Sequence, residues 1–282
     1  MSDLRIILVT GKLVSLLFIK SLIIGWIGAN TGIGYELVRL LAQQGHTVYL
    51  GARNPAAGRE AEYVSIRYTV MRMSYLTECS VRQKLHSEGL KSVKFIEIDI
   101  SKLSTILAAR DSIASLSGKL DVLVNNAGIS NMGKDQNATS IDVTLIRETM
   151  ETNLYGLIET TKAFLPLLRK STTGVPVILN VSTDMASNAF QARPDSSVHV
   201  VAYNTSKAAA NSYTIALAHE LKSEGFKVNA VTPGFTSTKL NFFSAGGKTP
   251  EGGAKALLPW ALLGKDGGTS QFINGDGEVF PW

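Results

Sequence analysis

Short apolar runs alternate with longer segments of helical periodicity along almost the whole chain. The apolar runs are rich in Val, Ile and Leu and are bounded by turn-forming residues, which predicts buried strands. They cover residues 5–9, 46–50, 93–98, 120–124, 175–181, 227–231 and 271–274. The longer segments predict helices at residues 35–44, 103–116, 142–170, 203–223 and 251–263.

This alternation of strands and helices determines the fold class. It requires a parallel sheet with helices on both faces. Right-handed crossovers make such a sheet doubly wound. We therefore predict an α/β fold with about seven parallel strands, in a single domain over residues 1–282.

Polar or turn-forming residues follow the ends of several predicted strands. They are Arg53, Asp99, Asn125, Ser182, Thr183 and Pro233. In doubly wound sheets, ligands bind outside the carboxyl ends of the strands. We expect these residues to lie along one edge of the sheet and to form a ligand site there.

Composition narrows the choice of partner and compartment. The net charge is +5, but no block of Lys and Arg occurs, so we expect no nucleic-acid partner. The single cysteine, Cys79, rules out an intrachain disulfide and a Cys-rich zinc site, and it fits a reducing, cytoplasmic location. The apolar segment 12–28 contains Lys20, and the uncharged stretch after it is too short to cross a bilayer, so we expect no membrane anchor.

A glycine-rich turn, Ala29-Asn30-Thr31-Gly32-Ile33-Gly34, opens directly into the first predicted helix. A turn of this kind lets the N–H groups at a helix N-terminus approach a pyrophosphate. A strand should run straight into it, but the nearest predicted strand ends at Thr10-Gly11, and residues 12–28 lie between. Alone, the turn is a weak signal.

The segment Tyr203-Asn204-Thr205-Ser206-Lys207 places a phenol and an ammonium group on one helix face. A nearby positive charge favours the phenolate and lowers the pKa of a tyrosine. Such a tyrosine can give a proton to a carbonyl oxygen or take one from an alcohol. The spacing is common by chance on surface helices, and it favours catalysis only together with the hydroxyls of Ser182 and Thr183.

Together these features resemble the short-chain dehydrogenase/reductase family, and more narrowly its NADPH-dependent carbonyl reductases. The matching residues occur in the family's order: the glycine turn, Asn125-Asn126-Ala127-Gly128, Asn153, Ser182-Thr183, Tyr203 with Lys207, and Pro233-Gly234 with Thr238. The resemblance implies a Rossmann-like fold and an NADP(H)-dependent oxidoreductase acting on a small-molecule ketone, aldehyde or alcohol. It also implies a homodimer formed through the two long helices.

The resemblance assigns catalytic roles to five residues. Tyr203 would be the general acid and base, and Lys207 would hold the nicotinamide ribose and lower the pKa of the tyrosine. Asn153 would anchor a water in a proton relay. The family uses the second of two serines after this strand, so Thr183 takes that place here and Ser182 is the alternative.

The resemblance also predicts cofactor contacts. They involve Gly11, Asn30, Gly32, Ile33, Gly34, Asp99, Asn125, Ala127, Gly128, Tyr203, Lys207, Pro233, Gly234 and Thr238. Asp99 would meet the adenine, although it also reads as a turn or cap acid. The second strand ends at Gly51-Ala52-Arg53 without an acid, and an arginine suits the 2′-phosphate of NADP(H) rather than the free ribose of NAD.

Two segments interrupt the family pattern. Joining Gly11 to Ala29 restores the phosphate-binding motif as TGANTGIG, and omitting residues 62–80 restores one continuous helical run. Gly11-Lys12 can also be encoded with a splice-donor-like GTAAG. We interpret 12–28 and 62–80 as translated short introns or gene-model errors, with genuine insertions as the alternative. The alternative function is accordingly a non-catalytic or cofactor-impaired dinucleotide-binding protein.

Overall fold

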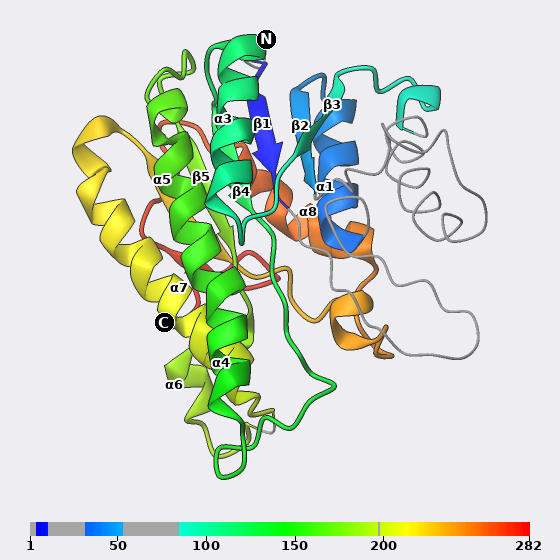
Figure 1. Ribbon diagram of the computed structural model, residues 1–282, viewed down its shortest axis with the longest axis vertical. Coiled ribbons are helices and arrows are strands. Elements are labelled where there is room, and N and C mark those ends of the chain that lie inside the picture. The colour runs from blue at the N-terminus through cyan, green and yellow to red at the C-terminus, as the bar shows by residue number, and fades with distance from the viewer. Residues whose placement is uncertain (1–3, 11–31, 53–84, 197) are drawn as a thin grey trace.

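The computed structural model describes residues 4–10, 32–52, 85–196 and 198–282. All seven strands form one parallel sheet in the order β3-β2-β1-β4-β5-β6-β7 (Figure 1). The strands are β1 (Ile6–Val9), β2 (Thr47–Ala52), β3 (Val93–Glu97), β4 (Val122–Asn125), β5 (Val177–Val181), β6 (Lys227–Val231) and β7 (Phe272–Ile273). The predicted Rossmann-like sheet is confirmed, and its order reverses between β1 and β4, where doubly wound folds bind ligands.

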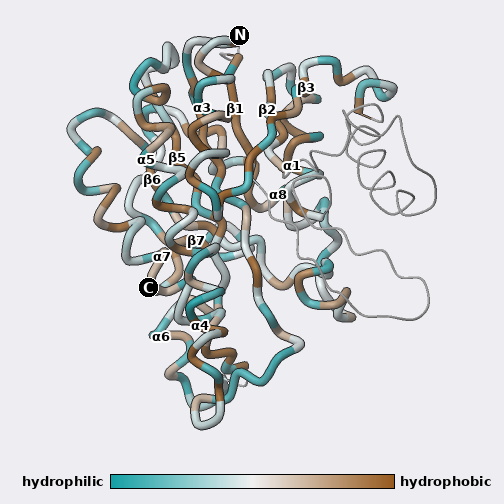
Figure 2. Tube along the Cα trace, viewed as in Figure 1, coloured by the Kyte–Doolittle hydropathy of each residue, from teal (hydrophilic) through white to brown (hydrophobic). Residues whose placement is uncertain are grey.

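Helices cover both faces of the sheet. The main helices are α1 (Gly32–Gln43), α3 (Leu103–Ser117), α4 (Val143–Met150), α5 (Leu157–Leu168), α7 (Val201–Glu220) and α8 (Pro250–Ala261). Because side chains alternate along a strand, Ile7 and Val9 pack with α1 and α8, whereas Leu8 packs with α3 and α5 on the other face. Figure 2 shows the hydrophobic residues concentrated along the strands and on the helix surfaces that meet them.

Two predicted segments differ in detail from the structure. The segment predicted as one helix over 142–170 is interrupted, because a π-helical turn, η2 (Glu151–Gly156), lies between α4 and α5. The segment predicted as a loop over 184–200 contains the 3-10 turn η3 (Asp184–Ala186) and the short helix α6 (Asn188–Gln191). Thr183 and Ser187 cap these two turns with their side chains, a local pattern that hydrophobic periodicity does not detect.

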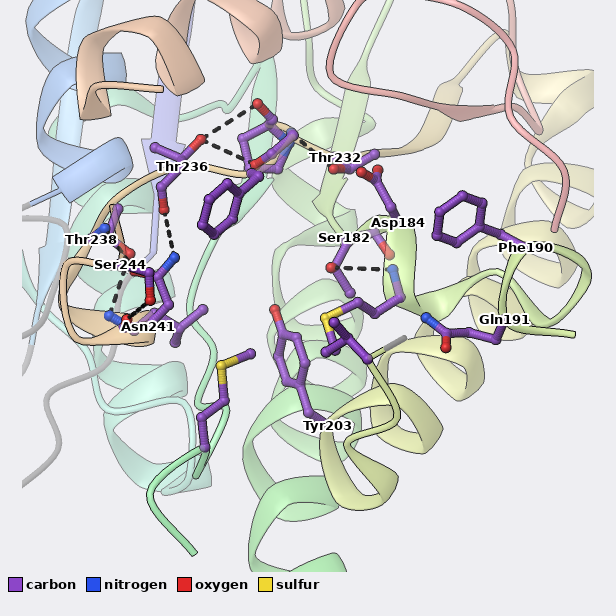
Figure 3. Close-up of a pocket in the computed structure, with 18 of the residues that line it drawn as sticks. Ser182, Asp184, Phe190, Gln191, Tyr203, Thr232, Thr236, Thr238, Asn241 and Ser244 are labelled. Carbon is purple, nitrogen blue, oxygen red and sulfur yellow. Dashed lines mark hydrogen bonds between the residues drawn. The ribbon is translucent and has the colours of Figure 1, made fainter. Parts of the chain in front are cut away.

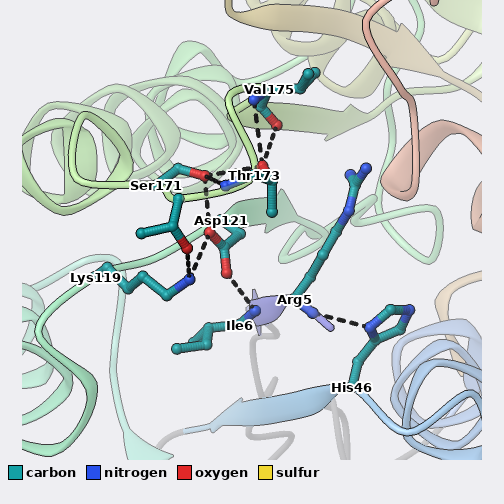
Figure 4. A network of polar contacts seen from close by, with 9 residues as sticks. Arg5, Ile6, His46, Lys119, Asp121, Ser171, Thr173 and Val175 are labelled. Carbon is teal, nitrogen blue, oxygen red and sulfur yellow. Dashed lines mark hydrogen bonds and ion pairs between the residues drawn. The ribbon is translucent and has the colours of Figure 1, made fainter. Parts of the chain in front are cut away.

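A buried carboxylate joins β1 to β4 at the amino-terminal end of the sheet (Figure 4). Asp121 is 0% exposed and accepts a 2.7 Å hydrogen bond from the backbone N–H of Ile6. Its other oxygen accepts hydrogen bonds from the Ser171 hydroxyl at 2.7 Å and from the Lys119 ammonium at 3.3 Å. Both oxygens of Asp121 are thus paired, and they hold the amino-terminal ends of β1 and β4 together.

The two proposed insertions, 12–28 and 62–80, lie outside the described residues. Within the part of the chain that the structure covers, no helix has the length and apolar character needed to cross a membrane.

Candidate active site

A cavity of about 510 Å³ lies at the carboxyl ends of β5 and β6 (Figure 3). Residues that follow these strands line it, together with Tyr203 at the start of α7 and the two turns after β5. The apolar part of its lining consists of Ile33, Met132, Met185, Phe190, Val198, Phe235 and Leu240. The position matches the expected ligand edge of the sheet.

Tyr203 lies in the first turn of α7 and is only 5% exposed. Its backbone N–H donates to the side-chain oxygen of Gln136 at 3.3 Å, and its ring points into the cavity (Figure 3). Burial raises the pKa of the phenol to about 12, while a hydrogen bond with Thr183 opposes this shift and the charge of Asp184 adds to it. The phenol is therefore protonated at neutral pH.

Lys207 lies one helical turn further along α7 and is 4% exposed. Its ammonium donates a 2.8 Å hydrogen bond to the backbone carbonyl oxygen of Val181, the last residue of β5. Burial lowers the pKa of this ammonium to about 8. A β-carbon added at Gly128 would lie 3.5 Å from the Lys207 nitrogen, so the glycine leaves room beside it.

The expectation that Lys207 lowers the pKa of Tyr203 is wrong for this structure. The pKa of the phenol moves upward, because loss of solvent outweighs the hydrogen bond from Thr183. The i, i+4 spacing correctly brings both side chains into one region, but the ammonium is directed to Val181. Helical spacing places residues on a common face and does not fix where each side chain points.

The two hydroxyls after β5 have different surroundings. The Ser182 hydroxyl donates to the side-chain oxygen of Asn211, a residue of α7, at 2.8 Å. The Thr183 hydroxyl accepts from the backbone N–H of Met185 at 3.4 Å, and it lowers the pKa of the Tyr203 phenol, against the larger effect of burial. Both residues line the cavity together with Tyr203, and the choice of Thr183 over Ser182 as the catalytic hydroxyl stays a prediction.

Asn153 lies in the π-helical turn η2 and is completely buried. Its side-chain oxygen accepts from the Ile129 N–H at 2.9 Å, and its amide donates to the Ile129 carbonyl at 2.8 Å and to the Ser206 hydroxyl at 2.9 Å. These bonds tie the loop after β4 to α7, beside Gly128 and Lys207. A role in a water relay stays a prediction.

Helix α1 begins at Gly32, whose φ of +63° is a left-handed conformation suited to glycine. A β-carbon at this position would lie 3.8 Å from a methyl carbon of Thr238. Ile33 lines the cavity, and Gly34 is buried where α1 packs on the sheet. The described end of the glycine turn and Thr238 thus lie together at one side of the cavity.

Thr238 also organises the segment after β6. Its hydroxyl accepts from the Leu240 N–H at 3.3 Å and forms a capping box with Asn241, which starts the turn η5 (Lys239–Asn241). Pro233 and Gly234 line the same side of the cavity, and Gly234 has a φ of +72°. The strand-end residues predicted after β6 therefore reach the cavity.

Other predicted cofactor residues have structural partners. The Asn125 side chain is buried and donates to Thr161 at 3.0 Å and to Asn180 at 2.8 Å. Asp99 accepts from the Ser101 hydroxyl at 2.7 Å, as expected for a turn acid. Ala127 is buried against the α3 and α5 side of the sheet. These residues shape the sheet centre, and their contact with a cofactor stays a prediction.

Gly11, Asn30 and Arg53 lie outside the described residues, so their predicted contacts stay predictions. The prediction missed Asp184 and Gln136. Asp184 follows the paired hydroxyls directly and could have been found from that position, whereas no local pattern marks Gln136. Among the described residues, no group of His, Cys, Asp and Glu could hold a metal ion.

The sheet order and the cavity at its carboxyl edge define a Rossmann-like α/β protein. A family model described as short chain dehydrogenase matches residues 62–244, more than half of the chain. A short-chain dehydrogenase/reductase of Stachybotrys chlorohalonatus is 31% identical over 277 residues, covering 90% of this chain and 92% of that protein. The chain therefore belongs to the short-chain dehydrogenase family of oxidoreductases.

Two further proteins are similar to the chain, one in sequence and one in fold. A (+)-neomenthol dehydrogenase of Arabidopsis thaliana is 30% identical over 287 residues, covering 84% of this chain and 90% of that protein. The crystal structure of an NADPH-bound carbonyl reductase from chicken fatty liver has a TM-score of 0.74 at 22% identity, with 99% of each chain covered. At that identity the second likeness concerns the fold alone.

Proposed function

We propose that the chain is an NADPH-dependent reductase of a small-molecule ketone or aldehyde, with Tyr203 as the proton donor. The observation that carries the proposal is that the buried Tyr203 phenol and the strand-end hydroxyls of Ser182 and Thr183 line one largely apolar cavity. Relatives named as a neomenthol dehydrogenase and an NADPH-bound carbonyl reductase support this chemistry and this cofactor. A cytoplasmic location stays part of the same expectation.

NADPH, when bound, supplies the hydride that reduces the carbonyl carbon. The chain's own groups act on the oxygen. Thr183 donates a hydrogen bond that polarises the carbonyl, and Tyr203 transfers its phenolic proton to the oxygen as negative charge develops there. The pKa of about 12 keeps the phenol protonated before this transfer, which suits the direction of reduction.

Lys207 fits a role in holding the nicotinamide ribose. Its ammonium is buried, and within the described part of the chain its hydrogen bond to Val181 uses one of three N–H donors. The other donors are available to ribose hydroxyls. Gly128 leaves space on that side of the ammonium.

The remainder of the cofactor fits the opposite side of the cavity. Helix α1 has no acidic residue in its first turn, so its N-terminus suits a pyrophosphate. Pro233, Gly234 and Thr238 line the cavity where a nicotinamide carboxamide would lie. We assign the 2′-phosphate to Arg53 on the sequence argument alone.

A dimer through the two long helices also stays a proposal. Val143 and Tyr155, on α4 and η2, are 53% and 52% exposed. An apolar surface on this helix fits a partner helix from a second copy. Light scattering during gel filtration would distinguish a dimer from a monomer.

The second candidate is a cofactor-impaired protein, because residues 12–28 separate Gly11 from the rest of the glycine turn. NADPH oxidation with a panel of ketones tests both candidates, using the full chain and a variant that lacks residues 12–28. Turnover by the shortened chain with little by the full chain indicates an active site impaired by the segment. No turnover by either chain, with both folded and binding NADPH, overturns the reductase proposal.

A further inference from the structure

The charged groups at the cavity are of one sign. Among the described lining residues, the ionisable side chains other than Tyr203 are the carboxylates of Asp184 and Asp195, with no Lys, Arg or His. Asp195 is neutralised by Arg193, whose guanidinium donates to both carboxylate oxygens, at 3.0 and 2.7 Å. Asp184 is therefore the carboxylate whose charge bears on a bound molecule.

Asp184 directly follows the proposed catalytic hydroxyl Thr183 and starts the turn η3. It lies on the side of the cavity formed by Phe190 and Thr232 (Figure 3). Its oxygen Oδ1 is buried and has no hydrogen-bond partner among the described residues, while a hydrogen bond with Thr232 involves the carboxyl group. Because this unpaired oxygen is shielded from solvent, the charge of Asp184 acts on a group in the adjacent cavity more strongly than it would in water.

One cation acts on this charge but makes its hydrogen bonds elsewhere. The Lys248 ammonium attracts Asp184, but it donates to the carboxylate of Asp276 at 3.1 Å and to the Gly275 carbonyl at 2.8 Å. Burial raises the pKa of Asp184, and the charge of Asp276 adds to that shift. The field of Asp184 also reaches the phenol of Tyr203, where it favours the protonated form.

The other walls restrict what the cavity accepts. Met132, Met185, Phe190, Phe235 and Leu240 present apolar surface, and desolvating a charged group against such walls without a partner costs free energy. An anionic group would be both desolvated and repelled by Asp184, whereas an ammonium group would be desolvated but paired.

We propose that Asp184 determines substrate specificity, so that the site selects apolar carbonyl compounds carrying a protonated amine over matched compounds carrying a carboxylate. This inference rests on the proposed reductase function, because it concerns the substrate of the same site. It assigns to Asp184 the recognition of a substituent and not a step of the chemistry.

The test uses three aryl ketones of similar size whose substituent is an isopropyl, a dimethylaminomethyl or a carboxymethyl group. The kcat/KM of each ketone is measured with NADPH for the full chain and for its Asp184→Asn and Asp184→Ser variants. If the full chain binds NADPH weakly, the same three proteins are compared in a form that lacks residues 12–28. We expect kcat/KM for the amine to exceed kcat/KM for the carboxylate by about 100-fold. Each substitution should reduce that ratio by about tenfold or more, because removing one charge from the cavity wall needs to change the relative binding of the two ketones only modestly to have this effect. Asp111→Asn, on the exposed surface of α3 and paired with Arg110, is the matched control and should leave the ratio as it is.

Binding gives a second readout that does not depend on turnover. Affinities of the corresponding amino and carboxylate alcohols, measured by calorimetry, should show the same preference and the same loss in both Asp184 variants. If the isopropyl ketone is turned over but substitution of Asp184 does not change the amine-to-carboxylate ratio of kcat/KM, the inference is overturned. The reductase proposal then remains intact. Absence of turnover with all three ketones contradicts the reductase proposal, and the binding ratio then decides the inference by itself.

Discussion

The ammonium of Lys207 donates a 2.8 Å hydrogen bond to the carbonyl oxygen of Val181, which joins helix α7 to the carboxyl end of β5. The next two residues after Val181 are Ser182 and Thr183. This bond therefore fixes the helix that carries Tyr203 against the strand that leads to these two hydroxyls. The ammonium is held inside the protein, and burial lowers its pKa to about 8. The bond thus positions the site, and the burial of the same ammonium makes the stability of the fold sensitive to pH.

Lys207→Met should remove a pH dependence of folding. The folded pKa of about 8 lies below the ordinary lysine value of 10.5, so between these values the unfolded chain binds more protons than the folded chain. The free energy of unfolding contributed by Lys207 therefore rises with pH across that window and is lowest below it. Urea unfolding at several pH values should show wild type gaining stability relative to Lys207→Met from about pH 8 to 10.5. A constant difference over this range would contradict the burial of the charged ammonium.

Tyr203→Phe should abolish most reductase activity, because the proton donor is lost. We expect kcat to fall roughly 100- to 10,000-fold, the usual contribution of general acid catalysis. Tyr213→Phe is a matched control, since burial also raises the pKa of Tyr213 to about 12 but the residue is not part of the cavity lining. Steady-state NADPH oxidation with one ketone compares the variants. Equal loss of activity in both would show that the effect is structural.

The two hydroxyls after β5 should differ in importance. Thr183→Ala should lower kcat by about 100-fold, as for loss of one donor to a developing oxyanion, while Thr183→Ser keeps the hydroxyl and retains most activity. Ser182→Ala removes the 2.8 Å bond to Asn211 and should mainly reduce thermal stability. If Ser182→Ala instead gives the larger loss of kcat with an unchanged melting temperature, Ser182 is the catalytic hydroxyl.

The strands of the sheet could be predicted from the sequence because buried strands consist of continuous apolar residues. Runs such as Ile6–Val9 and Val177–Val181 are apolar on both faces, since helices cover both. The positions of Tyr203 and Thr183 at the cavity also followed from strand ends and helix spacing. Side-chain direction did not follow, because it depends on neighbours distant in sequence: Asn125 is turned towards Thr161 and Asn180.

Other features depend on interactions that no local pattern encodes. The π-helical turn that contains Asn153 ends at Gly156, which packs tightly against Ile100. A β-carbon added at Gly156 would lie 2.5 Å from the Ile100 carbonyl oxygen. The direction of the pKa shift at Tyr203 depends on burial by the folded chain. The spacing of residues in the sequence predicts neither the π-helical turn nor the direction of this pKa shift.

An aromatic cluster supports the cavity wall from behind. The ring of Phe280 lies 5.4 Å from that of Phe190, which lines the cavity, and 5.5 Å from that of Phe272 in β7. Trp282 stacks on Phe272 at 5.4 Å, and its carbonyl oxygen accepts from the Ala189 N–H at 3.3 Å. The segment after β7 therefore holds helix α6 in place.

Phe280→Ala should consequently weaken both stability and substrate binding. Loss of two ring contacts and of a partly buried side chain should lower the free energy of unfolding by about 2 kcal/mol. Because Phe190 loses its support, KM for an apolar ketone should rise several-fold while kcat changes less. Phe243→Ala is the control, since Phe243 is 65% exposed and should change stability by less than about 0.5 kcal/mol. Chemical denaturation and steady-state kinetics measure the two effects, and equal behaviour of the two variants would show that the cluster does not support the wall.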